Sequence, residues 1–213
     1  KYNTNDLGYF TFGNTLDHYA WFGYRWIKPK NWYNNIYLNL NLQYSRQLNP
    51  SLYRSANFNA NVNGQLKNLW FAGIMVGYEP LYYDFFEARK PGYIAPMWSD
   101  YFTSAWFETN NAKKYKMYAE WMYVDRSKFN SVRHSISLGN RYRFSDKFSL
   151  DHSINFAPQR RNFGWAGFLN NEPVFGVRDI DNIVNQLNIK YSFNAMMNIN
   201  VRVRHYWFEV DYD

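Results

Sequence analysis

Residues 36–45 read Ile-Tyr-Leu-Asn-Leu-Asn-Leu-Gln-Tyr-Ser, and this stretch decides the fold class. Apolar residues occupy every second position from Ile36 to Tyr44, and mostly polar residues lie between them. Successive Cβ atoms of a β-strand point to opposite faces, so such a strand has one apolar face and one polar face. The length of the pattern predicts a strand well beyond the five or six residues that are usual in soluble proteins.

The same alternation recurs along the rest of the chain, for example at 148–156, 187–193 and 197–204. Most of the segments with this pattern are about ten residues or longer, which is the length that a tilted strand needs to cross a bilayer. We predict ten strands, at 8–27, 34–46, 55–66, 69–79, 101–109, 115–125, 132–144, 148–157, 181–193 and 196–209.

The connections between these strands alternate in length. The short turns are 28–33, 67–68, 110–114, 145–147 and 194–195, and the long loops are 47–54, 80–100, 126–131 and 158–180. Outer-membrane barrels have short periplasmic turns and long extracellular loops, with aromatic girdles at both interfaces. Aromatic residues flank the short turns here: Trp26, Trp32, Trp70, Phe107, Tyr115, Phe144, Phe148 and Phe193.

These patterns predict an all-β chain, with residues 1–213 forming part of a single antiparallel transmembrane β-barrel of the bacterial outer membrane. We expect the long loops to be extracellular, the short turns periplasmic, and lipid and lipopolysaccharide to contact the apolar face. Ten strands would leave both chain ends on the long-loop side, whereas barrels usually begin and end in the periplasm. We therefore expect the barrel to be incomplete here, with at least one more strand beyond each end.

Composition limits the chemistry. The chain has 213 residues, 22% of them aromatic, no cysteine, and a mean hydropathy of −0.61. Disulfides and cysteine-ligated metals are excluded. The net charge is +7, but the basic residues are dispersed, so we do not expect nucleic acid as a partner.

No catalytic, metal or cofactor motif is present. The four histidines, at 18, 134, 152 and 205, lack the spacing of a metal site, and we expect neither a metal nor a cofactor. Asp84 and Glu87 lie in one loop and would suit glycoside hydrolysis only if they converged across a cleft. We predict no catalytic residues and do not favour an enzyme.

The 80–100 loop is the first candidate site, because it places aromatic rings beside charged groups. Such rings can bind a sugar or a protein partner, or they can fold into the barrel mouth as a small core. The candidate residues for a glycan or partner are Tyr82, Tyr83, Asp84, Phe85, Phe86, Glu87, Arg89, Tyr93 and Trp98.

A second candidate site consists of basic residues on the polar faces of the strands. They would line the lumen and select anionic solutes, or they would pair with acidic residues or a plug. The residues are Arg133, Arg141, Arg143, Arg202 and Arg204.

Five segments carry a family resemblance: Asn-Asp-Leu-Gly-Tyr at 5–9, the Asp-Phe-Phe-Glu stretch at 82–92, and the segments 141–150, 175–179 and 204–207. Together they resemble the C-terminal barrel of a Bacteroidota outer-membrane family of unknown function. Members of that family carry an N-terminal carbohydrate-binding module of the family-9 type. The resemblance implies an outer-membrane barrel with a role near carbohydrate, and it supplies no catalytic residues.

Three functions remain open at this point. The first is a carbohydrate-associated barrel that binds or handles glycans at the cell surface. The second is a structural subunit of a larger outer-membrane secretion or transport complex, with other outer-membrane proteins as partners. The third is an anion-preferring channel.

Overall fold

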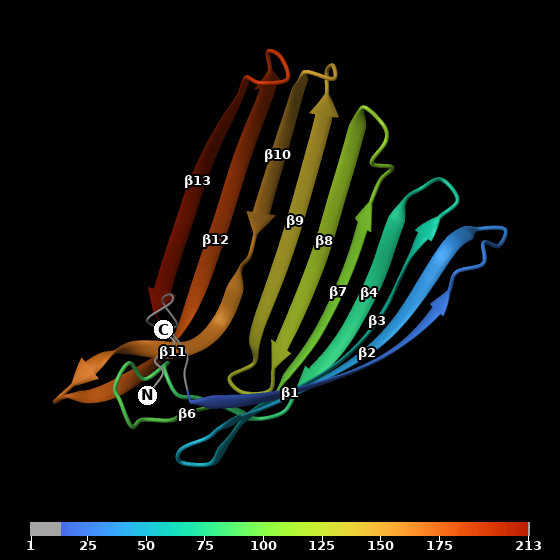
Figure 1. Ribbon diagram of the computed structural model, residues 1–213. Helices are drawn as coiled ribbons and strands as arrows, with labels where there is room; N and C mark the ends of the chain where they lie inside the picture. Colours follow the sequence, from blue (N-terminus) through green and yellow to red (C-terminus); the bar gives the residue numbers. More distant parts are fainter. Residues whose placement is uncertain (1–13, 213) are drawn as a thin grey trace.

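A computed structural model describes residues 14–212, which form one large antiparallel sheet of 11 strands and a small two-stranded sheet (Figure 1). The described part of the chain contains no helix that is long and apolar enough to cross a membrane. The strands are β1 (Thr15–Trp26), β2 (Tyr33–Gln47), β3 (Leu52–Leu66), β4 (Phe71–Glu79), β5 (Tyr82–Asp84), β6 (Ala95–Met97), β7 (Asp100–Glu108), β8 (Tyr115–Arg126), β9 (Ser131–Arg143), β10 (Phe148–Phe156), β11 (Gln159–Leu169), β12 (Glu172–Ser192) and β13 (Asn198–Tyr212).

The large sheet runs up and down in chain order. Its main order is β1-β2-β3-β4-β7-β8-β9-β10-β12-β13, and every neighbouring pair is antiparallel. These are the ten strands that the alternation predicts, except that residues 8–13 of the first lie outside the described residues. The prediction of an all-β chain built on a large antiparallel sheet is therefore confirmed.

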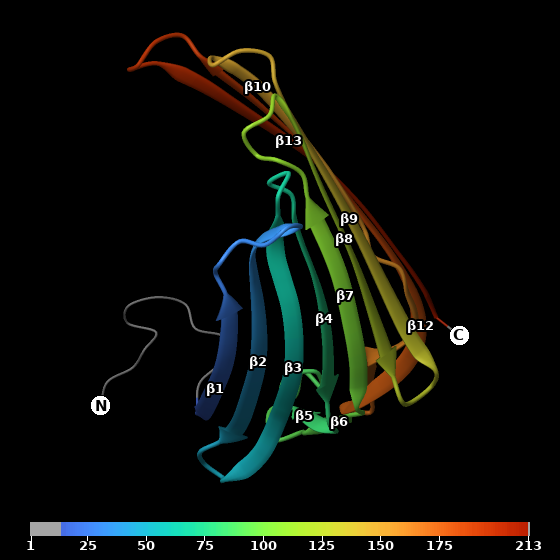
Figure 2. The same ribbon diagram turned by 90° about the vertical axis from the view of Figure 1, so that its right-hand side faces the viewer.

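The sheet is curved, as Figure 2 shows, and β1 and β13 form its two ends. Within residues 14–212, β1 pairs with β2 alone and β13 pairs with β12 alone. No pairing joins β1 to β13 in this part of the chain. The described strands thus make an open, curved wall.

The prediction of a long loop at 158–180 is wrong, because this segment forms β11 and the first part of β12. β10 and β11 pair with β12 in one continuous register, from Phe156↔Ile183 to Gln159↔Ile180. Only Ala157 and Pro158 interrupt this line. Two register shifts within β11 break the two-residue alternation, which hid the strand in the sequence. The hairpin closes through two residues with positive φ, Asn170 and Asn171, as tight hairpin turns require.

The 80–100 loop also contains regular structure, because β5 and β6 pair as a short hairpin. Of these two strands β5 contacts β3, and both lie at the long-loop end of the large sheet (Figure 2). The loop therefore folds back on the strand ends and does not extend away from them.

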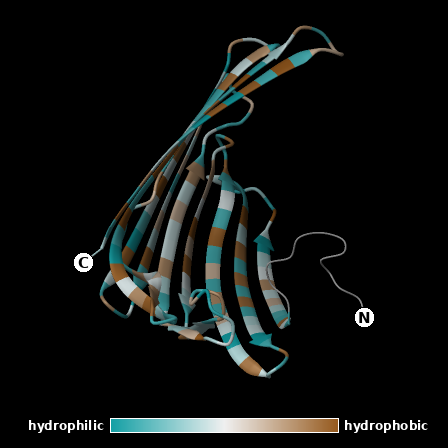
Figure 3. Cartoon of the chain, turned by 90° about the vertical axis from the view of Figure 1, so that its left-hand side faces the viewer, coloured by the Kyte–Doolittle hydropathy of each residue, from teal (hydrophilic) through white to brown (hydrophobic). Residues whose placement is uncertain are grey.

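The two faces of the large sheet differ in chemistry, which Figure 3 shows as alternating hydrophobic and hydrophilic bands along the strands. We call the face that carries Leu40 the apolar face and the face that carries Asn41 the polar face. On the apolar face Phe22, Leu40 and Val76 are 63%, 42% and 57% exposed. Large apolar side chains on this face are thus exposed along the length of the strands in the described part of the chain.

Aromatic rings border the apolar face at both ends of the strands. At the short-turn end, Phe144 stacks on Phe148 at 4.7 Å between ring centroids, and Tyr191 meets Phe193 at 4.8 Å. At the long-loop end, Tyr78 and Tyr101 lie 4.7 Å apart. Two belts of rings therefore bound one apolar band.

We predict that Leu40→Arg costs about 2–4 kcal/mol of unfolding free energy, because it places a charge in the middle of the apolar band. Asn41→Arg is the matched control. It points to the polar face and loses only the hydrogen bond from Asn41 to Asn59, about 1 kcal/mol. Urea unfolding of the intact protein in detergent micelles measures both, and equal losses would contradict the assignment of the faces.

Candidate binding site at the long-loop end

The 80–100 loop is shaped by its own acidic residue. The Asp84 carboxylate accepts hydrogen bonds from the backbone N–H groups of Phe86 and Glu87, at 2.7 and 2.8 Å. Arg89 and Gly92 then adopt positive φ and turn the chain back toward β6. Asp84 is thus used in a local turn of the kind that Asx side chains favour.

Glu87 and Arg89 fasten the loop to the β11–β12 hairpin. A Glu87 carboxylate oxygen accepts the backbone N–H of Trp165 at 2.7 Å, and the Arg89 guanidinium lies 4.2 Å from the centre of the Trp165 ring. Arg178, on β12, donates to the Trp165 carbonyl at 3.2 Å. Trp165 is therefore held by groups from two segments that are far apart in the sequence.

A second fastening lies at the tip of the hairpin. Lys90 Nζ donates to the Asn171 carbonyl at 2.6 Å and pairs with Glu172 at 3.2 Å, and the Tyr93 hydroxyl donates to the Glu172 carboxylate. These hydrogen bonds, from Tyr93 first and then from Lys90, hold the pKa of the Glu172 carboxyl below its usual value. The loop and the hairpin therefore form one folded unit.

Aromatic packing adds a small core between the loop, the β8–β9 turn and the hairpin. The Trp98 ring lies 5.6 Å from Phe129 and 5.2 Å from Phe163, and Phe163 stacks on Phe175 at 5.1 Å. Lys128 Nζ lies 4.1 Å from the centre of the Trp98 ring, at cation–π distance.

A buried ionic cluster lies under the loop, beyond the aromatic belt at the strand ends. Arg126 Nε contacts both carboxylate oxygens of Asp100 at 3.1 Å, and Asp100 is 5% exposed. Burial raises the pKa of Asp100, although Arg126 opposes that rise. Burial, followed by the charge of Asp100, raises the pKa of Glu79, and burial raises the pKa of Tyr82 to about 12. The loop thus keeps water from the strand ends that it covers.

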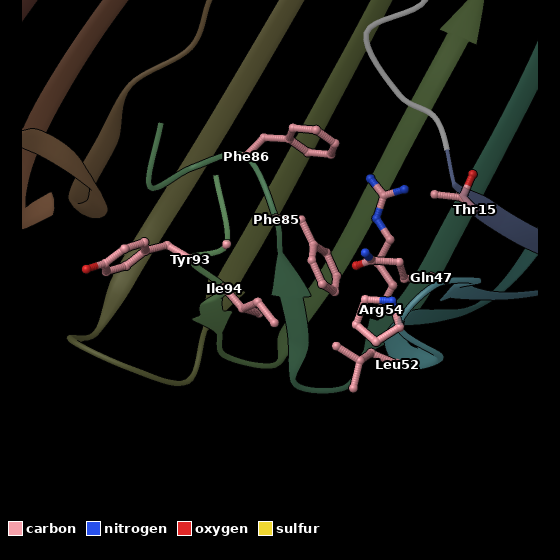
Figure 4. Close-up of a pocket in the computed structure, with 10 residues that line it drawn as sticks. Thr15, Gln47, Leu52, Arg54, Phe85, Phe86, Tyr93 and Ile94 are labelled. Atoms are coloured by element: carbon pink, nitrogen blue, oxygen red, sulfur yellow. The ribbon is translucent and has the colours of Figure 1, made fainter. Parts of the chain in front are cut away.

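One cavity opens between the loop and the ends of β1, β2 and β3, with a volume of about 320 Å³. Figure 4 shows Phe85 beside Arg54 and Gln47, while the Tyr93 hydroxyl points away from them. Phe85, Phe86, Tyr93 and Ile94 come from the loop, and Thr15, Gln47, Pro50, Leu52 and Arg54 come from the strand ends. The walls are mainly apolar, and polar groups lie on the side of the strands.

The structure divides the candidate loop residues into two groups. Phe85, Phe86 and Tyr93 line the cavity. The remaining residues have internal roles: Tyr82 beside the ionic cluster, Tyr83 edge-on to Tyr53, and Asp84, Glu87, Arg89 and Trp98 as described above. Asp84 and Glu87 point to different backbone groups and do not converge across a cleft.

The basic candidates also separate. Arg141 and Arg202 lie in one cross-strand row, with Asp151 and Asn188 between them. Arg141 pairs with Asp151 at 2.5 Å, and Arg202 donates to Asn188 at 2.9 Å.

The other three basic candidates lie away from that row. Arg143 donates to three carbonyls of the β7–β8 turn, and Arg204 donates to Gln186. Arg133 is eight residues from Arg141 on β9, roughly 26 Å away at about 3.3 Å per residue, so it does not join the others.

Three residues that form the polar hollow or hold the 80–100 loop were not among the candidates predicted from the sequence. Lys190 lies beside Arg202 in a polar hollow of about 290 Å³, and Trp165 and Glu172 hold the loop. The two-residue alternation on β12 places Lys190 on the polar face and could have identified it. The roles of Trp165 and Glu172 depend on contacts across about 80 residues, which no local pattern indicates. Within residues 14–212 no three histidine, aspartate or glutamate side chains come together as metal ligands.

Comparison with known families adds one result. The family described as "Domain of unknown function (DUF5916)" matches residues 1–213. The chain belongs to this family. No curated protein and no solved structure matches. The membership covers the loop and the hairpin of this DUF5916 chain as well as the sheet.

We predict that Gly164→Ala loosens the loop. An added Cβ would lie 2.6 Å from Arg178 Nη2 and 3.0 Å from a Glu87 oxygen, and these flexible groups would move and weaken their hydrogen bonds to Trp165. We expect the free energy of opening the loop to fall by about 1 kcal/mol. Because cleavage follows local opening, trypsin should then cut after Arg89 roughly fivefold faster than in the parent protein.

Gly167→Ala is the matched control, because nothing lies within 4 Å of its Cβ position. Equal cleavage rates in the two variants would show that Gly164 has no part in holding the loop.

Proposed function

We propose that this chain is part of the wall of an outer-membrane β-barrel whose extracellular end binds carbohydrate at the cell surface. The observation that supports this most is the bare apolar face bounded by two aromatic belts. A soluble protein would cover such a face, whereas hydrocarbon chains solvate it.

The height of the apolar band fits a bilayer. On β8 the apolar face carries Tyr115, Met117, Ala119, Trp121 and Tyr123, and the next residue on that face is Asp125. From Tyr115 to Tyr123 the strand rises roughly 26 Å at about 3.3 Å per residue. These are nine residues, and a transmembrane strand tilted by about 45° needs about 9–11 residues to cross the bilayer. In this arrangement the long-loop end, with its cavity, faces the outside of the cell.

The cavity suits a sugar more than a catalytic reaction. The Phe85 and Phe86 rings offer apolar surface to the C–H face of a sugar, and Gln47 and Thr15 offer hydrogen bonds to hydroxyl groups. The two loop carboxylates are occupied by backbone N–H groups, which leaves no acid–base pair for hydrolysis. The family resemblance, which implies a carbohydrate-binding module elsewhere in such proteins, supports the same ligand class.

We predict that cells displaying the intact protein bind a fluorescent neutral polysaccharide that is too large to enter a barrel, tested as α-glucan and β-glucan. Phe85→Ala should lower this binding about tenfold, for the loss of one stacked ring. Phe168→Ala is the control, because Phe168 is equally aromatic, 50% exposed and outside the cavity. Equal binding by both variants, or no binding by the parent protein, would refute the carbohydrate role of the cavity.

A second candidate function, preference for anions, is favoured by the polar hollow that Arg141, Lys190 and Arg202 line on the polar face. Three cations with one carboxylate, Asp151, leave this hollow net positive. We predict that the reversal potential of the intact protein in planar bilayers indicates anion preference, and that Lys190→Gln with Arg202→Gln reduces it. Arg133→Gln is the control, and an unchanged reversal potential in the double variant would dismiss this function.

A further inference from the structure

Asparagine side chains form a hydrogen-bonded strip on the polar face, along two neighbouring strands. Asn39 and Asn41 of β2 donate to Asn61 and Asn59 of β3 at 2.8 and 2.7 Å. Along β3, Asn59 donates to Asn57 at 3.1 Å and Asn63 donates to Asn61 at 2.9 Å. The amide groups therefore have fixed orientations, and each still has unused donor or acceptor capacity.

Flat aromatic rings lie on both sides of this strip, each above a glycine. An ideal Cβ on Gly23 would lie 2.2 Å from the nearest atom of the Trp21 ring. An ideal Cβ on Gly77 would lie 2.1 Å from the nearest atom of the Phe102 ring.

At Gly73 the nearest ring atom, from Trp106, is 2.3 Å from the ideal Cβ. In all three cases the ring occupies the space that a side chain would fill, a known way to protect glycine in a sheet. Each ring therefore covers the backbone at its glycine.

The register places rings and amides in one continuous surface. A single cross-strand row runs Trp21, Asn41, Asn59, Gly77 and Phe102. Trp21 Nε1 also donates to the side-chain amide oxygen Oδ1 of Asn39 at 3.1 Å, which ties the ring to the strip.

The strip has a definite length and position. From Asn57 to Asn63 it is about 20 Å long, at about 3.3 Å per residue, which is the length of a short oligosaccharide. The strands β2, β3 and β4 each have two partner strands, so the strip lies inside the sheet and away from its edges.

We propose that this surface, which we call the amide strip (Asn39, Asn41, Asn57, Asn59, Asn61 and Asn63), binds a neutral oligosaccharide. The flat rings would contact the apolar faces of the sugars, and the amides would bind neighbouring hydroxyl groups as donor and acceptor together. All six side chains of the strip are uncharged amides, which favours a neutral sugar. Charged groups lie only at its margins, where Glu79 is hydrogen-bonded to Asn57 and the Arg25 guanidinium lies 5.8 Å from the centre of the Trp21 ring. The inference rests on the proposed function and extends it, from a cavity at the loops to a second, interior site on the polar face.

The test measures binding of soluble hexasaccharides to the intact protein in detergent by calorimetry. The probes are a neutral β-1,4-glucan, a neutral α-1,4-glucan and an acidic galacturonan, each of six units. We expect one neutral probe to bind more tightly than the acidic one. Asn59→Ala with Asn61→Ala should weaken that binding about tenfold, for the loss of two hydrogen-bonding groups.

The matched control is Asn155→Ala with Asn182→Ala, which removes two asparagines from the same face, away from the flat rings and from the polar hollow. It should bind like the parent protein. Trp106→Leu provides an independent variant in case the amide variant does not fold, and it should also weaken binding.

The inference would be overturned if every folded strip variant bound the neutral probe as tightly as the parent protein does. It would also be overturned if the parent protein bound no neutral probe, or bound the acidic probe more tightly. If cells bind the polysaccharide but the protein in detergent binds no hexasaccharide, the proposed function stands and only the interior site is refuted.

Discussion

The backbone pairing of the long strands is the constraint on which the rest of this structure depends. Each interior strand uses its N–H and C=O groups in two antiparallel ladders, which fixes the register and with it the face that every side chain occupies. A slip of one residue between β2 and β3 would turn Leu40 to the polar face and Asn41 to the apolar face. The apolar band and the amide strip exist because that register holds through the middle of the strands, from Asn35↔Gln65 to Ser45↔Ser55 in the β2–β3 pair.

The regular pattern ends at the long-loop end, where the candidate cavity lies. Register shifts occur there, between Ser45 and Arg46 of β2 and twice within β11. Shifts of this kind redirect side chains and release the chain from strict alternation. They allow the β11–β12 hairpin to meet the 80–100 loop, so that Glu87 and Arg89 reach Trp165. The cavity at this end thus lies where the sheet departs from regular alternation.

The sequence predicted the ten long strands because alternation is a local signal that each strand carries by itself. It failed at 158–180, where three glycines, two prolines and the register shifts interrupt the alternation of a segment that still pairs along β12. It selected the loop residues by composition, but only the fold shows that Phe85 faces a cavity while Glu87 binds Trp165. The flat rings were also beyond reach, because the pairing of Gly73 with Trp106 and of Gly77 with Phe102 depends on cross-strand register.

The central claim is that this wall crosses the outer membrane with its long loops outside, and cysteine labelling of intact cells tests it most directly. The chain has no cysteine of its own, so an introduced thiol is unique within it. Pro91→Cys lies exposed in the 80–100 loop, and Lys67→Cys lies exposed in the short β3–β4 turn. The account predicts that a membrane-impermeant maleimide labels the first in intact cells and the second only after the outer membrane is permeabilised. Labelling of Lys67→Cys in intact cells, alone or together with Pro91→Cys, would contradict it.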